Sequence, residues 1–182
     1  MTHTRITICG ITRPEDAVAA AEAGIDAIGL VFYPPSPRAV DTETARAIVA
    51  ALPPFVTATG LFLDADREHI ESVLARVPLG LLQFHGQEDA AFCRAFDRPY
   101  IKAVGMADGA DPAGLARAWP DAAGLLADSH SPGEAGGTGK RFPWERLAGR
   151  RDYRLILAGG LDPDNVYSAV RAVRPEAVDV SS

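Results

Sequence analysis

Short apolar runs recur along the chain and alternate with longer amphipathic stretches. The first run, Arg5–Cys9, alternates apolar and polar residues, whereas Ala27–Phe32 is apolar throughout. Alternation is typical of a half-buried strand, and a continuous short apolar run is typical of a parallel strand buried on both faces. The complete pattern predicts eight strands, at Arg5–Cys9, Ala27–Phe32, Phe55–Leu63, Leu79–Phe84, Tyr100–Val104, Gly124–Ala127, Arg154–Ala158 and Ala177–Ser181.

The stretches between these runs have the spacing and the punctuation of helices. Proline, threonine or an acidic residue stands near the start of most of them, and a glycine stops the first. Seven helices are predicted, at about Pro14–Gly24, Thr42–Leu52, Asp66–Arg76, Glu88–Phe96, Pro112–Trp119, Pro143–Gly149 and Pro163–Val173.

Strands that alternate with helices through short loops form a parallel sheet. Eight such units are the number that closes a barrel, so the sequence predicts an α/β protein of the (β/α)8 TIM-barrel type in a single domain over residues 1–182. A doubly wound open sheet is the alternative, because alternation does not fix the strand order. It ranks second, since no G-x-G-x-x-G pattern follows the first strand.

The last predicted strand has no helix after it, because the sequence stops at Ser182. A barrel of eight strands needs eight covering helices, and bare apolar strands would cost about 25 cal/mol per Å² of exposed apolar area. We therefore expect the barrel to lack its C-terminal helix and the natural chain to continue by about 20 to 30 residues, a short helix with its loops.

Composition narrows the range of partners. The net charge is −6 and the basic residues are scattered, which argues against a nucleic-acid or membrane partner and leaves a small anionic ligand possible. No apolar run approaches the length of a membrane span and the N-terminus lacks a secretion signal, so a cytoplasmic location is expected. Cys9 and Cys93 have neither disulfide-framework nor metal-type spacing.

Chemically active residues stand where predicted strands end. Cys9 ends the first strand, His85 follows the fourth, and Asp128 follows the sixth, just before a glycine-rich loop. Ligands of parallel α/β proteins bind at the carboxyl ends of the strands, so these positions are candidates for chemistry. From the residues alone, Cys9 can equally be a small buried hydrophobe, Asp128 a turn cap before Ser129, and His85 a histidine satisfied by backbone.

Six motifs together resemble the phosphoribosylanthranilate isomerase family over the whole chain. They are ICGIT at 8–12, GLVFYPPSPRAV at 29–40, QFHG at 83–86, Asp128 with GGTGKRF at 136–142, AGGLDPDNV at 158–166, and DVSS at 179–182. Members of this family carry out the Amadori rearrangement of N-(5-phosphoribosyl)anthranilate in tryptophan biosynthesis. The resemblance implies an isomerase that needs no cofactor or metal and acts as a monomer or homodimer.

The resemblance also implies roles for three residues. Cys9 becomes the general base, Asp128 the general acid, and the guanidinium of Arg38 the partner of the anthranilate carboxylate. The family usually has a lysine directly before the Ile-Cys pair, where this chain has Thr7. A buried thiol needs a nearby cation or donor to ionise, and Arg5 is the nearest candidate along the strand.

Phosphate is expected at the loops after the seventh and eighth strands, where barrels of this kind bind it. Gly159 and Gly160 let the backbone approach an anion closely, and Ser181 and Ser182 can add donors from the neighbouring strand end. His85 is expected to line the same pocket.

Two other functions compete. A Schiff-base lyase would use Lys102, which lies in the fifth strand, and would leave Cys9 without a role. A barrel that binds a sugar phosphate without catalysis is the second alternative, suggested by Thr7 and by the missing ending.

Overall fold

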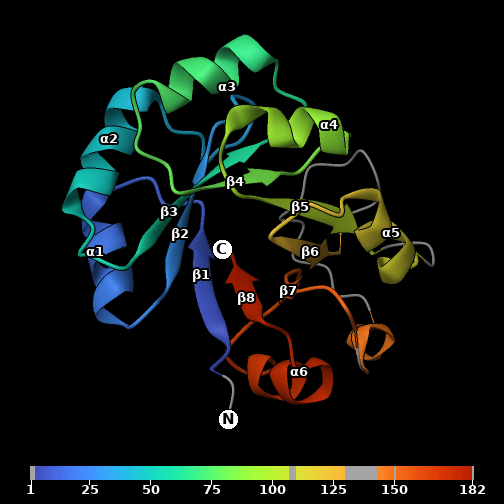
Figure 1. The fold of residues 1–182 in the computed structure, drawn as a ribbon. Helices are drawn as coiled ribbons and strands as arrows, with labels where there is room; N and C mark the ends of the chain where they lie inside the picture. Colours follow the sequence, from blue (N-terminus) through green and yellow to red (C-terminus); the bar gives the residue numbers. More distant parts are fainter. Residues whose placement is uncertain (1–2, 107–109, 130–142, 150, 182) are drawn as a thin grey trace.

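The eight strands form a closed parallel barrel in strict chain order, which settles the fold in favour of the barrel over the open sheet. The computed structural model describes residues 3–106, 110–129, 143–149 and 151–181. The ring closes where β1 pairs with β8, with Ile8 opposite Val180. Figure 1 shows the strands at the centre and the helices outside them. The strands are β1 (Arg5–Cys9), β2 (Ala27–Val31), β3 (Thr57–Phe62), β4 (Leu81–Phe84), β5 (Tyr100–Gly105), β6 (Gly124–Asp128), β7 (Leu155–Leu157) and β8 (Ala177–Val180).

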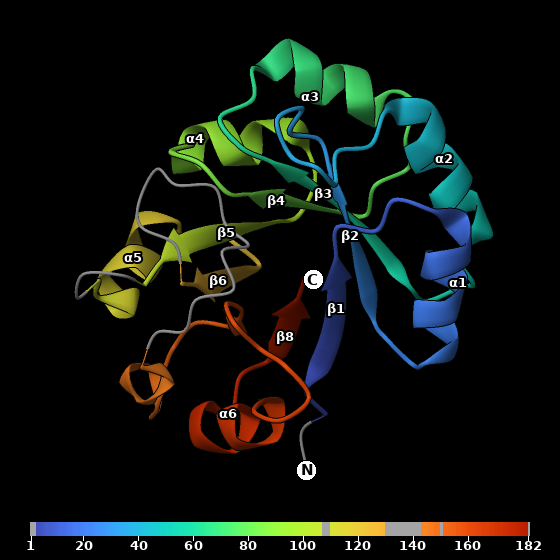
Figure 2. The same cartoon turned by 180° about the vertical axis from the view of Figure 1, so that it is seen from behind.

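The helices surround the barrel, as the view from behind also shows (Figure 2). An aspartate caps four of them, and in each case its carboxylate accepts a backbone N–H from the first turn. These caps are Asp41, Asp66, Asp89 and Asp111. The helices are α1 (Pro14–Glu22), α2 (Thr42–Ala51), α3 (Arg67–Leu74), α4 (Ala90–Cys93), α5 (Pro112–Ala118) and α6 (Val166–Val173).

All eight predicted strands are confirmed, and the differences lie in the helices. The helix predicted at Pro143–Gly149 is a 3-10 turn, Trp144–Leu147, because its few residues are bounded by a proline and by Gly149 with φ of 113°. The last helix begins at Val166 instead of Pro163, since Asp162 accepts N–H groups of a separate turn before it.

Side-chain alternation along the strands separates an inner from an outer core. In β4, Leu82 and Phe84 face outward into the larger cluster beneath the helices, whereas Gln83 faces the barrel interior and lines its cavities. Because all strands are parallel, every strand's carboxyl end lies at one end of the barrel. Within the described residues, no helix is long and apolar enough to cross a membrane, and a cytoplasmic location stays a prediction.

Candidate active site

One cavity of about 590 Å³ opens at the carboxyl ends of the strands. It brings together residues that lie far apart in the sequence, and nearly all of the predicted site residues line it. These are Cys9, Arg38, His85, Asp128, Gly159, Gly160 and Ser181. Ser182 and the glycine-rich stretch 136–142 lie outside the described residues.

Cys9 ends β1, and its thiol faces this cavity. Burial raises the pKa of the thiol well above its ordinary value, and the negative charge of Asp179 raises it further. The Arg38 guanidinium and the Gly10 backbone N–H act in the opposite direction. Together these protein groups favour the thiol form over the thiolate.

Among the described residues, the cation that acts on the thiol is Arg38, and the expectation that Arg5 supplies it is wrong. Arg5 starts β1 at the opposite end of the barrel, where its Nη1 lies 2.5 Å from Oε1 of Glu176. Cys9 follows Arg5 by four residue steps of extended strand, a span of roughly 13 Å. Thr7 lies between them and is in register with Asp179 of β8.

Two glycines make room for Cys9 and Arg38. A Cβ placed on Gly29 of β2 would lie 2.6 Å from Sγ of Cys9, well inside contact distance. A Cβ on Gly10 would lie 2.6 Å from Cδ of Arg38, and Gly10 has φ of +87°, which favours glycine. Both positions sit in motifs of the sequence, at ICGIT and GLVFY.

Substituting Gly29 with alanine is expected to displace the thiol and lower kcat by roughly tenfold or more, since an extra methyl in a close-packed site forces its neighbours to move. Gly80→Ala is the matched control, because its Cβ would meet nothing closer than 3.4 Å. Steady-state kinetics of both purified variants check this. Equal kcat values would show that Cys9 does not need the space that Gly29 provides.

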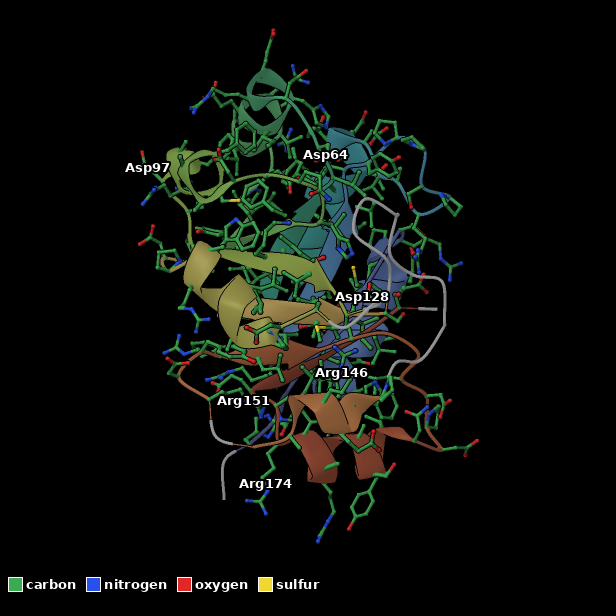
Figure 3. The ribbon with its side chains drawn as sticks, turned by 90° about the vertical axis from the view of Figure 1, so that its right-hand side faces the viewer. Asp64, Asp97, Asp128, Arg146, Arg151 and Arg174 are labelled. Carbon is green, nitrogen blue, oxygen red and sulfur yellow. The ribbon has the colours of Figure 1, made fainter. Side chains whose placement is uncertain are left out.

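Asp128 ends β6 and is 5% exposed. Its Oδ1 accepts the Ser129 backbone N–H at 2.6 Å, so the turn-capping interpretation holds for one oxygen. The other oxygen, Oδ2, lies 3.5 Å from Nε2 of His85, whose Nδ1 lies 3.4 Å from Oε1 of Gln83. Figure 3 shows Asp128 among the strands, far from Arg174 on the outer layer. One carboxyl group thus serves both as a cap and as a cavity group.

The carboxylate of Asp128 leaves no room for a side chain on the glycine that follows β7. Gly159 has φ of +81°, and a Cβ there would lie 2.8 Å from Oδ1 of Asp128 and 2.8 Å from the Ser129 nitrogen. Gly160 follows with φ of +66°. Successive backbone N–H groups in a turn can form a concavity that favours anions.

The sequence-based reasoning missed Asp179, a carboxyl group on β8 that lines the same cavity. Burial and, after it, the charge of Asp128 raise the pKa of Asp179 to about 7, while Arg38 opposes the shift. The available signal was a charged residue inside an otherwise apolar strand, at an inward-facing position two residues after Ala177.

Lys102 lies elsewhere, on the outer face of β5 and 1% exposed. Its Nζ donates to the carbonyl oxygens of Gly86 at 2.6 Å and Phe84 at 3.2 Å, and it lies 3.4 Å from Oε2 of Glu88. An amine held by these acceptors and absent from the cavity lining is a structural cation, which removes the basis of the Schiff-base lyase alternative.

The matching family model and the relatives in sequence agree on one family. Residues 6–182 match the family model described as N-(5'phosphoribosyl)anthranilate (PRA) isomerase. An N-(5'-phosphoribosyl)anthranilate isomerase of Alcanivorax borkumensis is 58% identical over 181 residues, which are 100% of this chain and 83% of that protein. One of Pseudomonas aeruginosa is 57% identical, over 100% of this chain and 86% of that protein.

Two solved structures with the same fold carry the same description. Phosphoribosyl anthranilate isomerase of Thermotoga maritima superposes with a TM-score of 0.86 at 43% identity, covering 98% of this chain and 88% of that one. A second structure, a complex of phosphoribosyl anthranilate isomerase with reduced 1-(o-carboxyphenylamino)-1-deoxyribulose 5-phosphate, has a TM-score of 0.80 at 38% identity. It covers 99% of this chain and 88% of that one.

Proposed function

Since the chain belongs to the N-(5'-phosphoribosyl)anthranilate isomerase family, we propose that Cys9 and Asp128 carry out the proton transfers of its reaction. The protein converts N-(5-phosphoribosyl)anthranilate to 1-(2-carboxyphenylamino)-1-deoxyribulose 5-phosphate, a step of tryptophan biosynthesis. The observation that carries the proposal is the cavity in which a thiol and a carboxyl group from different strands face the same space.

Asp128 is the general acid. Opening the ribose ring requires a proton on the ring oxygen while C1 becomes an iminium carbon. Oδ2 of Asp128 faces the cavity on the side of His85, and Oδ1 is held by the Ser129 N–H, so the carboxyl group is fixed in orientation. A fixed donor transfers its proton without first reorganising.

Cys9 is the general base that removes the proton from C2. The protein groups around it favour the thiol form, as its raised pKa indicates. A positive charge favours a thiolate, and the bound substrate acquires one when Asp128 opens the ring and the iminium forms. Once the iminium has formed, the Cys9 thiol can therefore lose its proton to water. The resulting thiolate then removes the proton from C2.

The rest of the cavity suits the two anionic ends of the substrate. Gly159, Gly160 and Ser181 lie together after β7 and β8 and supply backbone N–H groups and a hydroxyl for the phosphate, with Ser182 as the next residue. Arg38 lines the same cavity from the loop after β2 and pairs with the anthranilate carboxylate. His85, whose Nε2 lies 3.5 Å from Oδ2 of Asp128, positions the carboxyl group of Asp128 in the cavity.

Turnover of N-(5-phosphoribosyl)anthranilate by the purified chain, followed by chromatography of substrate and product, tests the proposal. We expect conversion together with binding of the reduced product analogue. Binding without conversion would favour a non-catalytic sugar-phosphate-binding barrel. Absence of both would contradict the assignment of the cavity.

We also propose that the chain forms a homodimer through the amino ends of its strands. Phe55 is fully exposed there, with φ of 73°, at the rim of a second cavity of about 400 Å³. Burying a phenyl side chain contributes about 2 to 3 kcal/mol. One similar structure is described as monomers of a dimeric phosphoribosylanthranilate isomerase of Thermotoga maritima.

Sedimentation velocity checks the dimer. The wild-type chain is expected to sediment as a dimer and Phe55→Glu as a monomer, because a carboxylate is costly to desolvate where the phenyl ring would be buried. A wild-type monomer at all concentrations would refute the proposal.

A further inference from the structure

The side chain of Asp179 lies in the active-site cavity, and the roles proposed for Cys9 and Asp128 leave it without a function. It lines the cavity at the carboxyl ends of the strands and also the second cavity at their amino ends, so it forms part of the floor between them. Its Oδ1 is buried and has no hydrogen-bond partner among the described residues. A buried polar atom of this kind is costly unless a ligand satisfies it.

The position of Asp179 relative to Cys9 is set by the pairing of β1 with β8. Asp179 is in register with Thr7, and Cys9 is the next residue of β1 on the inner face. Neighbouring strands lie about 4.8 Å apart, so the two side chains are adjacent on one inner face. Within the described part of the chain, the other charged groups that act on Asp179 are Asp128 from β6 and Arg38 from the loop after β2.

Adjacent groups on the same face reach substituents of the same substrate carbon. Cys9 takes the proton from C2. The same carbon also carries a hydroxyl group. That hydroxyl must lose its proton when the enolamine becomes the ketone. A carboxylate with an uncommitted oxygen beside Cys9 is suitably placed to accept it.

We propose that Asp179 is a third catalytic residue, the base that takes the proton from the C2 hydroxyl, so that ketone formation is completed on the protein. The inference rests on the roles proposed for Cys9 and Asp128. In this step the O–H bond at C2 breaks and its proton moves to the Asp179 carboxylate. The oxygen electron pair forms C2=O, and the former C1=C2 pair takes a proton at C1 from the Cys9 thiol.

The protons balance over the whole cycle. Asp128 gives one proton to the ring oxygen, and Asp179 receives one from the C2 hydroxyl. Cys9 takes one from C2 and returns one to C1. A proton passed through water from Asp179 to Asp128 restores both carboxyl groups, and Cys9 regains from water the proton that its thiol lost on ionising. The pKa of Asp179, about 7, lets the group both accept and release a proton near neutral pH.

The stereochemistry at C1 tests the proposal. Substrate deuterated at C1 is converted in ordinary water, and the product then carries one hydrogen and one deuterium at C1, whose arrangement NMR resolves. The wild-type protein is expected to yield one epimer, because Cys9 delivers from one side. Asp179→Asn is expected to consume substrate about tenfold more slowly, by loss of one charged hydrogen bond, and to yield both epimers from enolamine released into water.

Each other result has a definite meaning. Both epimers from the wild-type protein, or one epimer at the wild-type rate from Asp179→Asn, would overturn the inference while leaving the roles of Cys9 and Asp128 intact. No substrate consumption by the wild-type protein would instead overturn the proposed function. Asp164→Asn, an exposed aspartate outside the cavity lining, is the matched control and should behave as wild type.

The pH dependence of the free energy of unfolding tests whether the Asp179→Asn variant is folded. It also tests whether protein groups hold the Asp179 carboxylate of the wild type. The pKa of Asp179 is about 7 in the folded protein and about 3.9 in an unfolded chain, so the folded state binds more protons between these values. Its contribution to stability is present below pH 4 and is lost as the pH rises to 7.

The thermal midpoint of Asp179→Asn should therefore exceed that of the wild type above pH 7, and the difference should vanish near pH 4. Urea or thermal unfolding at pH 4, 6 and 8 measures this. A variant that is less stable than the wild type at pH 8 would show that protein groups hold the carboxylate, which overturns its role as a free acceptor.

Discussion

Replacing Cys9 with serine is expected to lower kcat by about 1,000-fold while leaving the affinity for the reduced product analogue nearly unchanged. A positioned general base contributes typically 10²- to 10⁴-fold, and a serine hydroxyl is too weakly acidic to ionise where even a thiol has a raised pKa. The exchange of sulfur for oxygen hardly alters the cavity. Steady-state kinetics and calorimetric titration of the variant separate the two effects.

Cys93→Ser is the matched control. Cys93 ends α4, is fully buried in the outer core, and has its thiol pKa raised to about 12, chiefly by burial. It does not line the cavity. Serine there should reduce stability somewhat through a buried hydroxyl but leave kcat per folded molecule unchanged. If Cys9→Ser retained wild-type kcat, another group would have to remove the C2 proton.

The positions of the strands and the gathering of strand-end residues can be predicted from the sequence. Apolar runs such as Ala27–Phe32 identify buried strands, and a closed parallel barrel necessarily brings all carboxyl ends together. Cys9 and Asp128 are therefore identifiable without knowledge of any distance between them. Their placement in one cavity follows from topology.

It is harder to predict which end of a strand a residue occupies and whether its charge is buried. Arg5 shares a strand face with Cys9, which suggests a place beside the thiol, but a strand has two ends and Arg5 starts it. Asp179 escapes notice because it sits inside an apolar run, where hydrophobicity hides a single charge. The short segment at 143–149 has helix-compatible residues, yet a single 3-10 turn satisfies it.

The errors at Arg5 and Asp179 have one physical cause. Sequence patterns report periodicity, whereas the electrostatics of a site depend on which charges are buried together. The pKa values of Cys9 and Asp179 are raised first by burial and then by neighbouring carboxylates, while Arg38 lowers both. Arg38 belongs to a loop after β2, and the sequence does not show that this loop folds over the end of β1.

Substituting Asp128 with asparagine is expected to lower kcat by about 1,000-fold, because an amide fills the same space but delivers no proton to the ring oxygen. The amide oxygen of the new side chain, in the geometry that Asp128 has now, can still accept the Ser129 N–H, so the end of β6 should keep its shape. Binding of the reduced product analogue should survive for the same reason. Kinetics and calorimetry of the purified variant measure both quantities.

The step of the reaction at which each variant stops identifies the general acid. If Asp128 opens the ring, Asp128→Asn should fail before the C2 proton is touched, so recovered substrate should contain no deuterium at C2 after incubation in D₂O. Cys9→Ser should also leave C2 unlabelled but still permit reversible ring opening, seen as exchange between the two anomers of the substrate. Rapid anomer exchange in Asp128→Asn would remove Asp128 from the acid role, and slow exchange there with rapid exchange in Cys9→Ser would assign ring opening to Asp128 and the C2 proton to Cys9.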